Sequence, residues 1–219
     1  DGLTIIGLGE GNEIPIISFA GVAGADFNIG SRSVTIENIR FHLNGVDALT
    51  GPIDVNAPGF TLRKCKLITA DSGAQAVVAI VTDDTANDFK LEDCYFYGSE
   101  DAGTTSAVRI VGGQRGVIQR NHIEGNFKVT AGGIETTTTA PGALLIRDNV
   151  IVNRTALATR AINLVPDTNA SIVNNRLHVR SNTSPISVRE TGTTVMAGHI
   201  LIAGNYYNNV TGVAAGILL

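Results

Sequence analysis

One short pattern of residues repeats along the whole sequence. Each copy begins with alternating apolar residues, is interrupted by polar residues and then becomes apolar again, as in LLIRDNVIVN at residues 144–153. The starts of neighbouring copies are 26 to 31 residues apart, a period typical of solenoid and repeat proteins rather than of an ordinary globular core. The copies begin at Leu3, Val34, Phe60, Phe89, Gly116, Leu144, Ala170 and Ile200.

A further short strand is predicted between most neighbouring copies. These segments alternate with period two and lie between clusters of Gly, Asn, Asp, Pro and Thr, which favour turns. Each repeat then supplies three strands, and each strand can pair in parallel with the same strand of the next repeat. The sequence therefore predicts an all-β fold, a single-stranded parallel β-helix of about eight coils, which forms one domain over residues 1–219. The further strands are expected at residues 53–55, 78–80, 108–110, 134–136, 162–164 and 186–188.

Composition and charge exclude several other classes of protein. Apolar residues make up 43% of the chain and there are 25 glycines, enough to bury a core and to turn often. No apolar run approaches the roughly 20 residues that a membrane helix needs, so no membrane insertion is expected. The 16 basic residues are scattered and the net charge is -4, which argues against nucleic-acid binding. The sequence starts at Asp1 rather than Met, which indicates a processed product or a fragment of a longer protein.

The residue in the middle of each copy carries a more specific signal. The pattern resembles the right-handed parallel β-helix of the pectate-lyase-like superfamily, in which this residue lies inside a tight bend between two strands. The resemblance implies right-handed winding but no single activity, because the superfamily includes lyases, hydrolases, adhesins and phage tailspikes. The residues of this column are Ile39, Cys65, Cys94, Asn121, Asn149, Asn175 and Asn205.

A buried amide in such a bend can bond the equivalent amide one coil away, so we predict an asparagine ladder from Asn121 to Asn205. Cys65 and Cys94 precede it as stacked buried thiols, since parallel side-chain vectors suit a disulfide poorly. The two preceding columns alternate in charge and are expected to form a solvated outer face. These columns are Glu37, Arg63, Glu92, Gln119 and Arg147, and Asn38, Lys64, Asp93, Arg120 and Asp148.

Candidate catalytic residues are few. In lyases of the superfamily, acidic residues that hold calcium and a basic residue that abstracts a proton lie on one outer sheet and its loops. Arg109, Glu135 and Asp101 are the candidates here, although an ion pair between Arg109 and Glu135 is the favoured interpretation. The acidic spacing matches no metal motif, so neither a metal nor a cofactor is predicted. The corresponding outward column is Asp54, Ala79, Arg109, Glu135, Asn163 and Ser187.

A second outward strip follows the bend and combines aromatic faces with hydrogen-bonding groups. Such a surface can contact sugars, and the alternative is an ordinary solvated face. The predicted ligand-binding residues are Lys66, Tyr95, Tyr97, His122 and Glu124.

Several apolar residues are expected to point outwards in the later coils, where a contiguous patch would indicate an interface. Phage tailspikes of this superfamily stand as parallel trimers, and the opening LTIIGLGEGNEIPIISFAG resembles the first coil of phage-encoded members. A homotrimer is therefore expected. The predicted interface residues are Val117, Leu145, Val150, Val152, Val173 and Leu201.

Together these features predict a non-catalytic module on a virion or another extracellular surface, with a structural or host-glycan-attachment role. Its partners would be a host surface polysaccharide or other virion proteins. One alternative is a polysaccharide lyase or glycoside hydrolase that acts on a bacterial or plant polysaccharide. The other alternative is a fragment of a bacterial adhesin.

Overall fold

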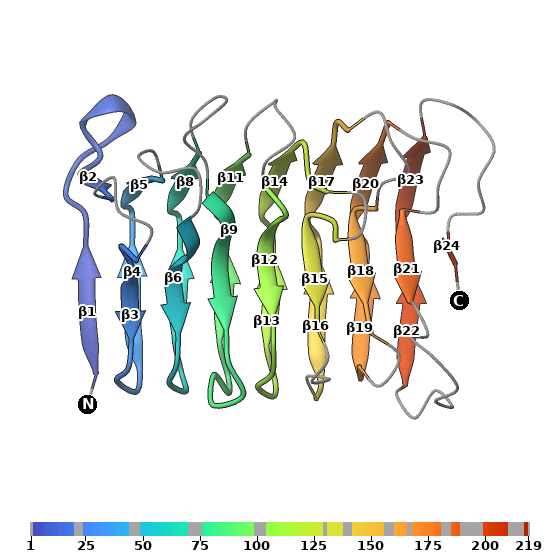
Figure 1. Ribbon diagram of the computed structural model, residues 1–219, viewed down its shortest axis with the longest axis horizontal. Coiled ribbons are helices and arrows are strands. Elements are labelled where there is room, and N and C mark those ends of the chain that lie inside the picture. Colours follow the sequence, from blue (N-terminus) through green and yellow to red (C-terminus); the bar gives the residue numbers. More distant parts are fainter. Residues whose placement is uncertain are drawn as a thin grey trace.

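The chain winds into a parallel β-solenoid with three sheets (Figure 1). The computed structural model describes residues 2–19, 24–43, 49–69, 76–98, 104–128, 131–137, 142–155, 160–165, 168–180, 185–188, 199–209 and 217–218. Each sheet contains eight strands, so that one winding contributes one strand to each sheet. The predicted all-β parallel fold is confirmed.

The strands of each sheet follow one another along the solenoid axis, with every pairing parallel. Sheet A contains β1 (Leu3–Ile6), β4 (Val34–Glu37), β7 (Thr61–Arg63), β10 (Lys90–Glu92), β13 (Val117–Gln119), β16 (Leu144–Arg147), β19 (Ala170–Val173) and β22 (Ile200–Ala203). Sheet B contains β2 (Ile16–Ser18), β5 (Arg40–His42), β8 (Lys66–Ile68), β11 (Tyr95–Tyr97), β14 (His122–Gly125), β17 (Val150–Asn153), β20 (Arg176–Val179) and β23 (Tyr206–Asn209). Sheet C contains β3 (Phe27–Ile29), β6 (Leu49–Val55), β9 (Ala76–Thr82), β12 (Ser106–Ile110), β15 (Ile134–Thr136), β18 (Ile162–Leu164), β21 (Ile186–Val188) and β24 (Ile217–Leu218). A 3-10 turn at Gly11–Glu13 lies between β1 and β2.

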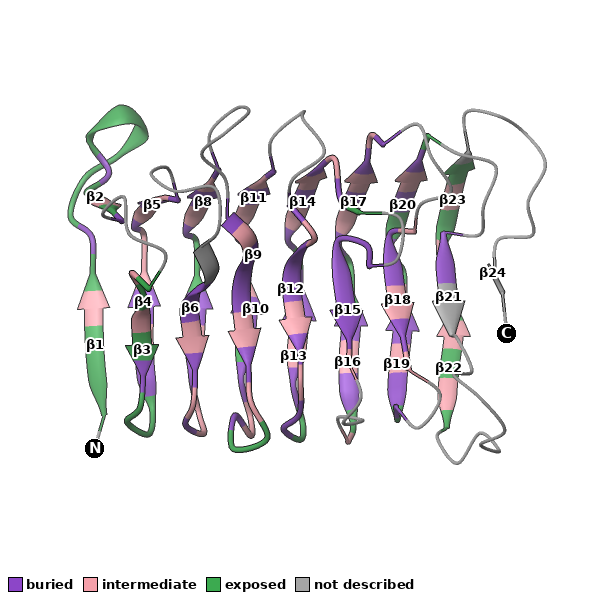
Figure 2. Ribbon diagram, in the orientation of Figure 1, coloured by how far each residue is buried: buried purple, intermediate pink, exposed green. Residues whose placement is uncertain are grey.

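Apolar side chains stack inside the solenoid in columns that run from winding to winding. The central column of sheet A is fully buried from Ile36 to Ile172. Figure 2 shows the buried residues on the strands of the middle windings, whereas β1 is mostly exposed. Gly116 makes room for the ring of Phe89, because a Cβ at position 116 would lie 2.3 Å from that ring. The repeat arises because each buried position must match its neighbours above and below.

The bend between sheets A and B has one backbone conformation in successive windings. The residue that precedes the ladder position has φ between 53° and 63° in each case, in the left-handed region. Asn, Asp and Gly tolerate this region best, and they occupy most of these positions. The residues are Asn38, Lys64, Asp93, Arg120, Asp148, Asn174 and Gly204.

Side-chain amides fill the inside of this bend and form the predicted ladder. The Nδ2 atoms of Asn121, Asn149 and Asn175 donate to the Oδ1 atom of the next asparagine at 3.1, 3.0 and 2.9 Å. Each Oδ1 atom also accepts a backbone N–H from the preceding winding, as in Asn121 N to Asn149 Oδ1 at 2.9 Å. Asn205, at the end, is half-buried. The ladder therefore satisfies backbone and side-chain groups at once.

Cys65 and Cys94 continue the column as free, buried thiols, as predicted. The Sγ atom of Cys94 lies 3.5 Å from the carbonyl oxygen of Leu62, which is the counterpart of the bond from Asn121 Nδ2 to the oxygen of Leu91. Burial raises the pKa of the Cys94 thiol well above its ordinary value. The Cys94 thiol is thus a neutral donor that replaces an amide.

The alternating charges on the outer side of the bend form ion pairs between neighbouring windings. Arg120 binds Asp93 through two hydrogen bonds of 2.7 and 2.9 Å, and Arg63 lies 2.7 Å from Glu37. The hydrogen bonds from Arg120 lower the pKa of Asp93. Because both partners of the Arg120 pair are partly exposed, such pairs fix the register more than they stabilise the fold.

One pairing differs from the sequence-based register. Strand β9 extends to Thr82, and the pairing of β6 with β9 is irregular between Thr50 and Ile53. Val81 therefore stands beside Asp54 and Arg109 in the outward column of sheet C. The placement of Ala79 in that column was wrong, since Ala79 is buried. No helix in the described part of the chain is long and apolar enough to cross a membrane.

Candidate functional site

The outer face of sheet B brings the predicted ligand-binding residues together on three consecutive windings. Strand alternation turns Phe96 and Ile123 into the core and leaves their neighbours on the surface. Tyr95 pairs with Lys66 on one side and with His122 on the other, and Tyr97 pairs with Glu124. The five residues therefore form one patch, which we call the aromatic patch (Lys66, Tyr95, Tyr97, His122 and Glu124).

Interactions within the aromatic patch hold its side chains in place. The rings of Tyr95 and His122 contact each other, with centroids 5.2 Å apart and planes tilted by 44°. The imidazole of His122 donates from Nε2 to Glu124 Oε2 at 2.9 Å. Partial burial, together with the positive charge of Arg154, lowers the pKa of His122. A neutral His122 that donates from Nε2 keeps its other ring nitrogen as a hydrogen-bond acceptor.

Arg154 completes this network, and sequence reasoning missed it. It follows strand β17 and forms a salt bridge with Glu124 on the preceding winding. Only 13% of the Glu124 side chain is exposed. Arg180 follows β20 at the same position, because Asn153 pairs with Val179. One feature of the sequence could have indicated this position: an arginine directly follows the strand in two successive repeats.

A shallow groove of about 280 Å³ extends the aromatic patch towards the C-terminal windings. Val152 points outward and is half-buried, and it lies between Glu124 and His178 in the same column of sheet B. The ring of His178 lies 6.4 Å from that of Tyr206. The groove is lined by Val152, Asn153, Arg154, His178, Val179 and Arg180.

The candidate catalytic pair on sheet C forms a buried ion pair. Arg109 Nε and Ser106 Oγ each lie 2.7 Å from Glu135 Oε1, and the Glu135 side chain is only 9% exposed. Both groups are thus engaged with each other, which is the favoured interpretation from the sequence. Asp101 lies outside the described residues. The part of the chain that the structure describes contains no group of three His, Cys, Asp or Glu side chains that could hold a metal ion.

The apolar residues predicted to form an interface lie on the surface of two different sheets. Val117, Leu145 and Leu201 occupy one outward column of sheet A, in which Ser171 is the interruption. Leu201 is 57% exposed. Val173 lies in a neighbouring column of the same sheet, whereas Val150 and Val152 belong to sheet B. The bend with the asparagine ladder separates the two groups.

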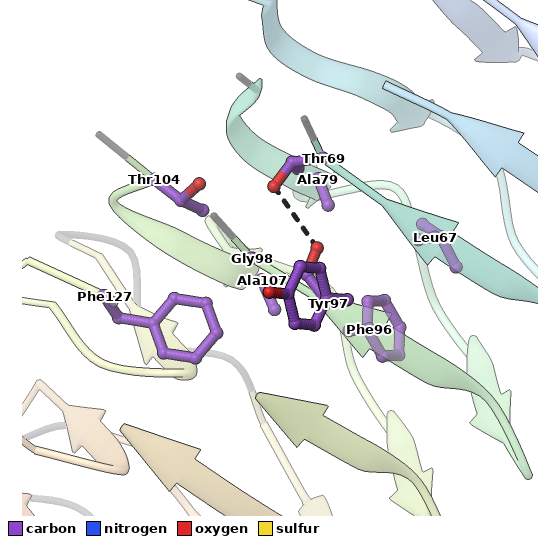
Figure 3. A pocket seen from close by; sticks show the side chains of 9 residues that line it. All are labelled: Leu67, Thr69, Ala79, Phe96, Tyr97, Gly98, Thr104, Ala107 and Phe127. Atoms are coloured by element: carbon purple, nitrogen blue, oxygen red, sulfur yellow. Dashed lines mark hydrogen bonds between the residues drawn. The ribbon is translucent and has the colours of Figure 1, made fainter. Parts of the chain in front are cut away.

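A small apolar cavity lies between sheets B and C, lined in part by Phe96, Ala107 and Phe127 (Figure 3). The hydroxyl of Thr69 at its edge donates to the carbonyl oxygen of Tyr97 at 3.2 Å. Its volume of about 10 Å³ holds at most one water molecule, so it cannot accommodate a sugar.

Comparison of the chain with protein-family models, with curated proteins and with solved structures gives no match.

Proposed function

We propose that this chain is a non-catalytic attachment module that binds a glycan of the host surface through the outer face of sheet B. Its place would be a virion or another extracellular surface, as in phage members of the pectate-lyase-like superfamily. The observation that carries the proposal is the concentration of sugar-contacting side-chain types on one face. The chain has four tyrosines and four histidines. Of these, Tyr95, Tyr97, Tyr206, His42, His122 and His178 lie at outward positions of sheet B.

The arrangement of the aromatic patch suits a polymer that lies along the solenoid axis. Neighbouring strands are about 4.8 Å apart, so that each winding presents one further row of side chains to an extended chain. Tyr95 offers an aromatic face to the C–H surface of a sugar ring. His122 and Glu124 offer hydrogen-bonding groups that their mutual contact already orients. Such pre-ordering lowers the entropy cost of binding.

The carboxylates of the two candidate sites favour binding over catalysis. Glu124 is bound by Arg154 and His122, and Glu135 is bound by Arg109 and Ser106. Both carboxylates are therefore engaged by side chains of the chain itself, which leaves them less accessible to a substrate.

Replacement of Tyr95 by alanine is expected to weaken glycan binding about tenfold, because a stacked aromatic face is lost. Binding is measured by calorimetry against a panel of bacterial surface polysaccharides. Lys90→Ala, on the outer face of sheet A, is the matched control and should bind as the wild type does. Release of reducing ends or unsaturated sugars by the wild-type chain would contradict the non-catalytic role, and so would an unchanged affinity of Tyr95→Ala.

We further propose that the module acts as a homotrimer that associates through sheet A. The supporting feature is the outward column of Val117, Leu145 and Leu201, which offers an apolar strip along the axis. A groove of about 330 Å³ that includes Leu145, Ser171 and His199 lies beside this column. It gives a neighbouring subunit a recess to fill.

The double variant Leu145→Glu/Leu201→Glu is expected to sediment as a monomer, whereas the wild type sediments as a trimer. The fold should persist, because both side chains point away from the core, and circular dichroism checks this. Thr61→Glu, in the same column three windings from Leu145, serves as the control and should remain trimeric. A wild-type chain that is monomeric at micromolar concentration would rule out this assembly.

A further inference from the structure

The outer face of sheet B is positively charged although the chain as a whole is negatively charged. The chain contains 16 basic and 20 acidic residues. We compare the charges at the described outward positions of the sheet B strands from β5 to β23, together with the residues that directly follow β17 and β20. These positions hold five basic residues and a single carboxylate, that of Glu124. Arg154 already neutralises Glu124. The five basic residues are Arg40, Lys66, Arg154, Arg176 and Arg180.

Two of these arginines are available to a ligand. Arg176 and Arg180 are exposed, and neither forms an ion pair with another described residue. Arg180 lines the groove beside Arg154, one winding further along the axis. Val152 lies on the same groove as an apolar surface, and His178 adds a ring with hydrogen-bonding nitrogens.

We propose that this groove binds the carboxylate of an acidic sugar, so that the glycan is an anionic polysaccharide with carboxylated residues. The guanidinium of Arg180 binds the carboxylate through two parallel hydrogen bonds. Val152 packs against the C–H face of the same sugar ring, and His178 bonds a hydroxyl group. This inference rests on the proposed glycan-binding function and names the class of its ligand.

The charge of the whole chain favours an acidic glycan over a nucleic acid. A nucleic-acid strand carries one charge about every 3.4 Å, and a net charge of -4 repels such a dense polyanion. A carboxylated polysaccharide carries at most one charge per sugar ring, and a sugar ring is longer than one nucleotide step, so its charge density is lower. Arg180 is the exposed arginine of the groove, so the groove offers one cation to one carboxylate.

The test uses the full chain with polygalacturonate, alginate and hyaluronan, each in its native form and after chemical reduction of its carboxyl groups to hydroxyls. At least one native polymer should bind about tenfold more tightly than its reduced form. Its affinity should fall as the salt concentration rises. Arg180→Gln should remove this preference and leave binding of the reduced polymer unchanged.

Arg32→Gln makes the same charge change at an exposed turn directly before β4. This variant should still prefer the native polymer to its reduced form. Equal binding of native and reduced polymers would overturn the acidic ligand while leaving glycan attachment intact. A chain that binds none of these polymers nor the neutral bacterial polysaccharides would overturn both. Tighter binding of a single-stranded oligonucleotide than of any carboxylated polymer would replace the glycan by a nucleic acid and overturn the inference.

Discussion

Arg109→Met is expected to lower the free energy of unfolding by about 3 kcal/mol, because it leaves the buried carboxylate of Glu135 without a cation. The Glu135 side chain is 9% exposed and, among the residues that the structure describes, would keep only the hydrogen bond from Ser106. The Arg109 side chain is 24% exposed, which places the expected loss at the lower end for buried ion pairs. Urea unfolding at pH 7, followed by circular dichroism, measures the change.

The double variant Arg109→Met/Glu135→Leu provides the control. It removes both charges and leaves apolar groups of similar size, so most of the lost stability should return. Glycan affinity should be unchanged in both variants, because sheet C lies apart from the aromatic patch. A double variant as unstable as the single one would show that the two side chains do not act as a pair.

Asn149→Ala is expected to destabilise the fold by about 3 kcal/mol, since it interrupts the ladder in the middle. The side chain is almost fully buried and donates to Asn175 Oδ1 and to the carbonyl oxygen of Ile118. It also accepts the backbone N–H and the side-chain amide of Asn121. An alanine leaves these buried groups unpaired, each at a cost of about 1 to 3 kcal/mol before relaxation.

Two further variants separate stacking from simple loss of a buried side chain. Asn205→Ala, at the half-buried end of the ladder, should cost about 1 kcal/mol, because water can replace the lost bonds. Asn149→Cys should fall between the wild type and Asn149→Ala, since the thiols of Cys65 and Cys94 already donate to equivalent carbonyl oxygens. Equal losses at positions 149 and 205 would argue against cooperative stacking.

The fold could be predicted because the stacking of successive windings makes the sequence periodic. A residue in the inner column of sheet A meets the same position of the next winding, so apolar residues must recur with the period of the winding. Phe89 and Gly116, where two of the repeats start, accordingly lie directly before two strands that pair in register. The asparagine column was visible for the same reason.

The left-handed bend was also present in the sequence but was not recognised. Five of the seven residues with positive φ before the ladder position are Asn, Asp or Gly, the types that adopt this conformation most readily. Lys64 and Arg120 occupy the other two positions, where their charges pair with Glu37 and Asp93.

Other parts of the candidate site depend on contacts that sequence alone does not carry. Arg154 lies beyond the end of β17, where alternation no longer predicts the direction of a side chain, so the sequence pattern does not predict its salt bridge with Glu124. Strand β9 continues to Thr82, beyond the strand expected at residues 78–80, and Val81 rather than Ala79 therefore lies beside Arg109. Turns and bulges obey local geometry rather than the repeat.

The three parallel sheets have a mechanical consequence. The hydrogen bonds between windings run along the solenoid axis. A tensile load along this axis is therefore shared, between each winding and the next, by the hydrogen bonds of all three sheets. The side-chain amides of the ladder add a further tether within the bend. A rod of this construction resists stretching and bending. A force applied to a ligand on the outer face of sheet B would therefore be transmitted to the ends of the rod with little change in its shape.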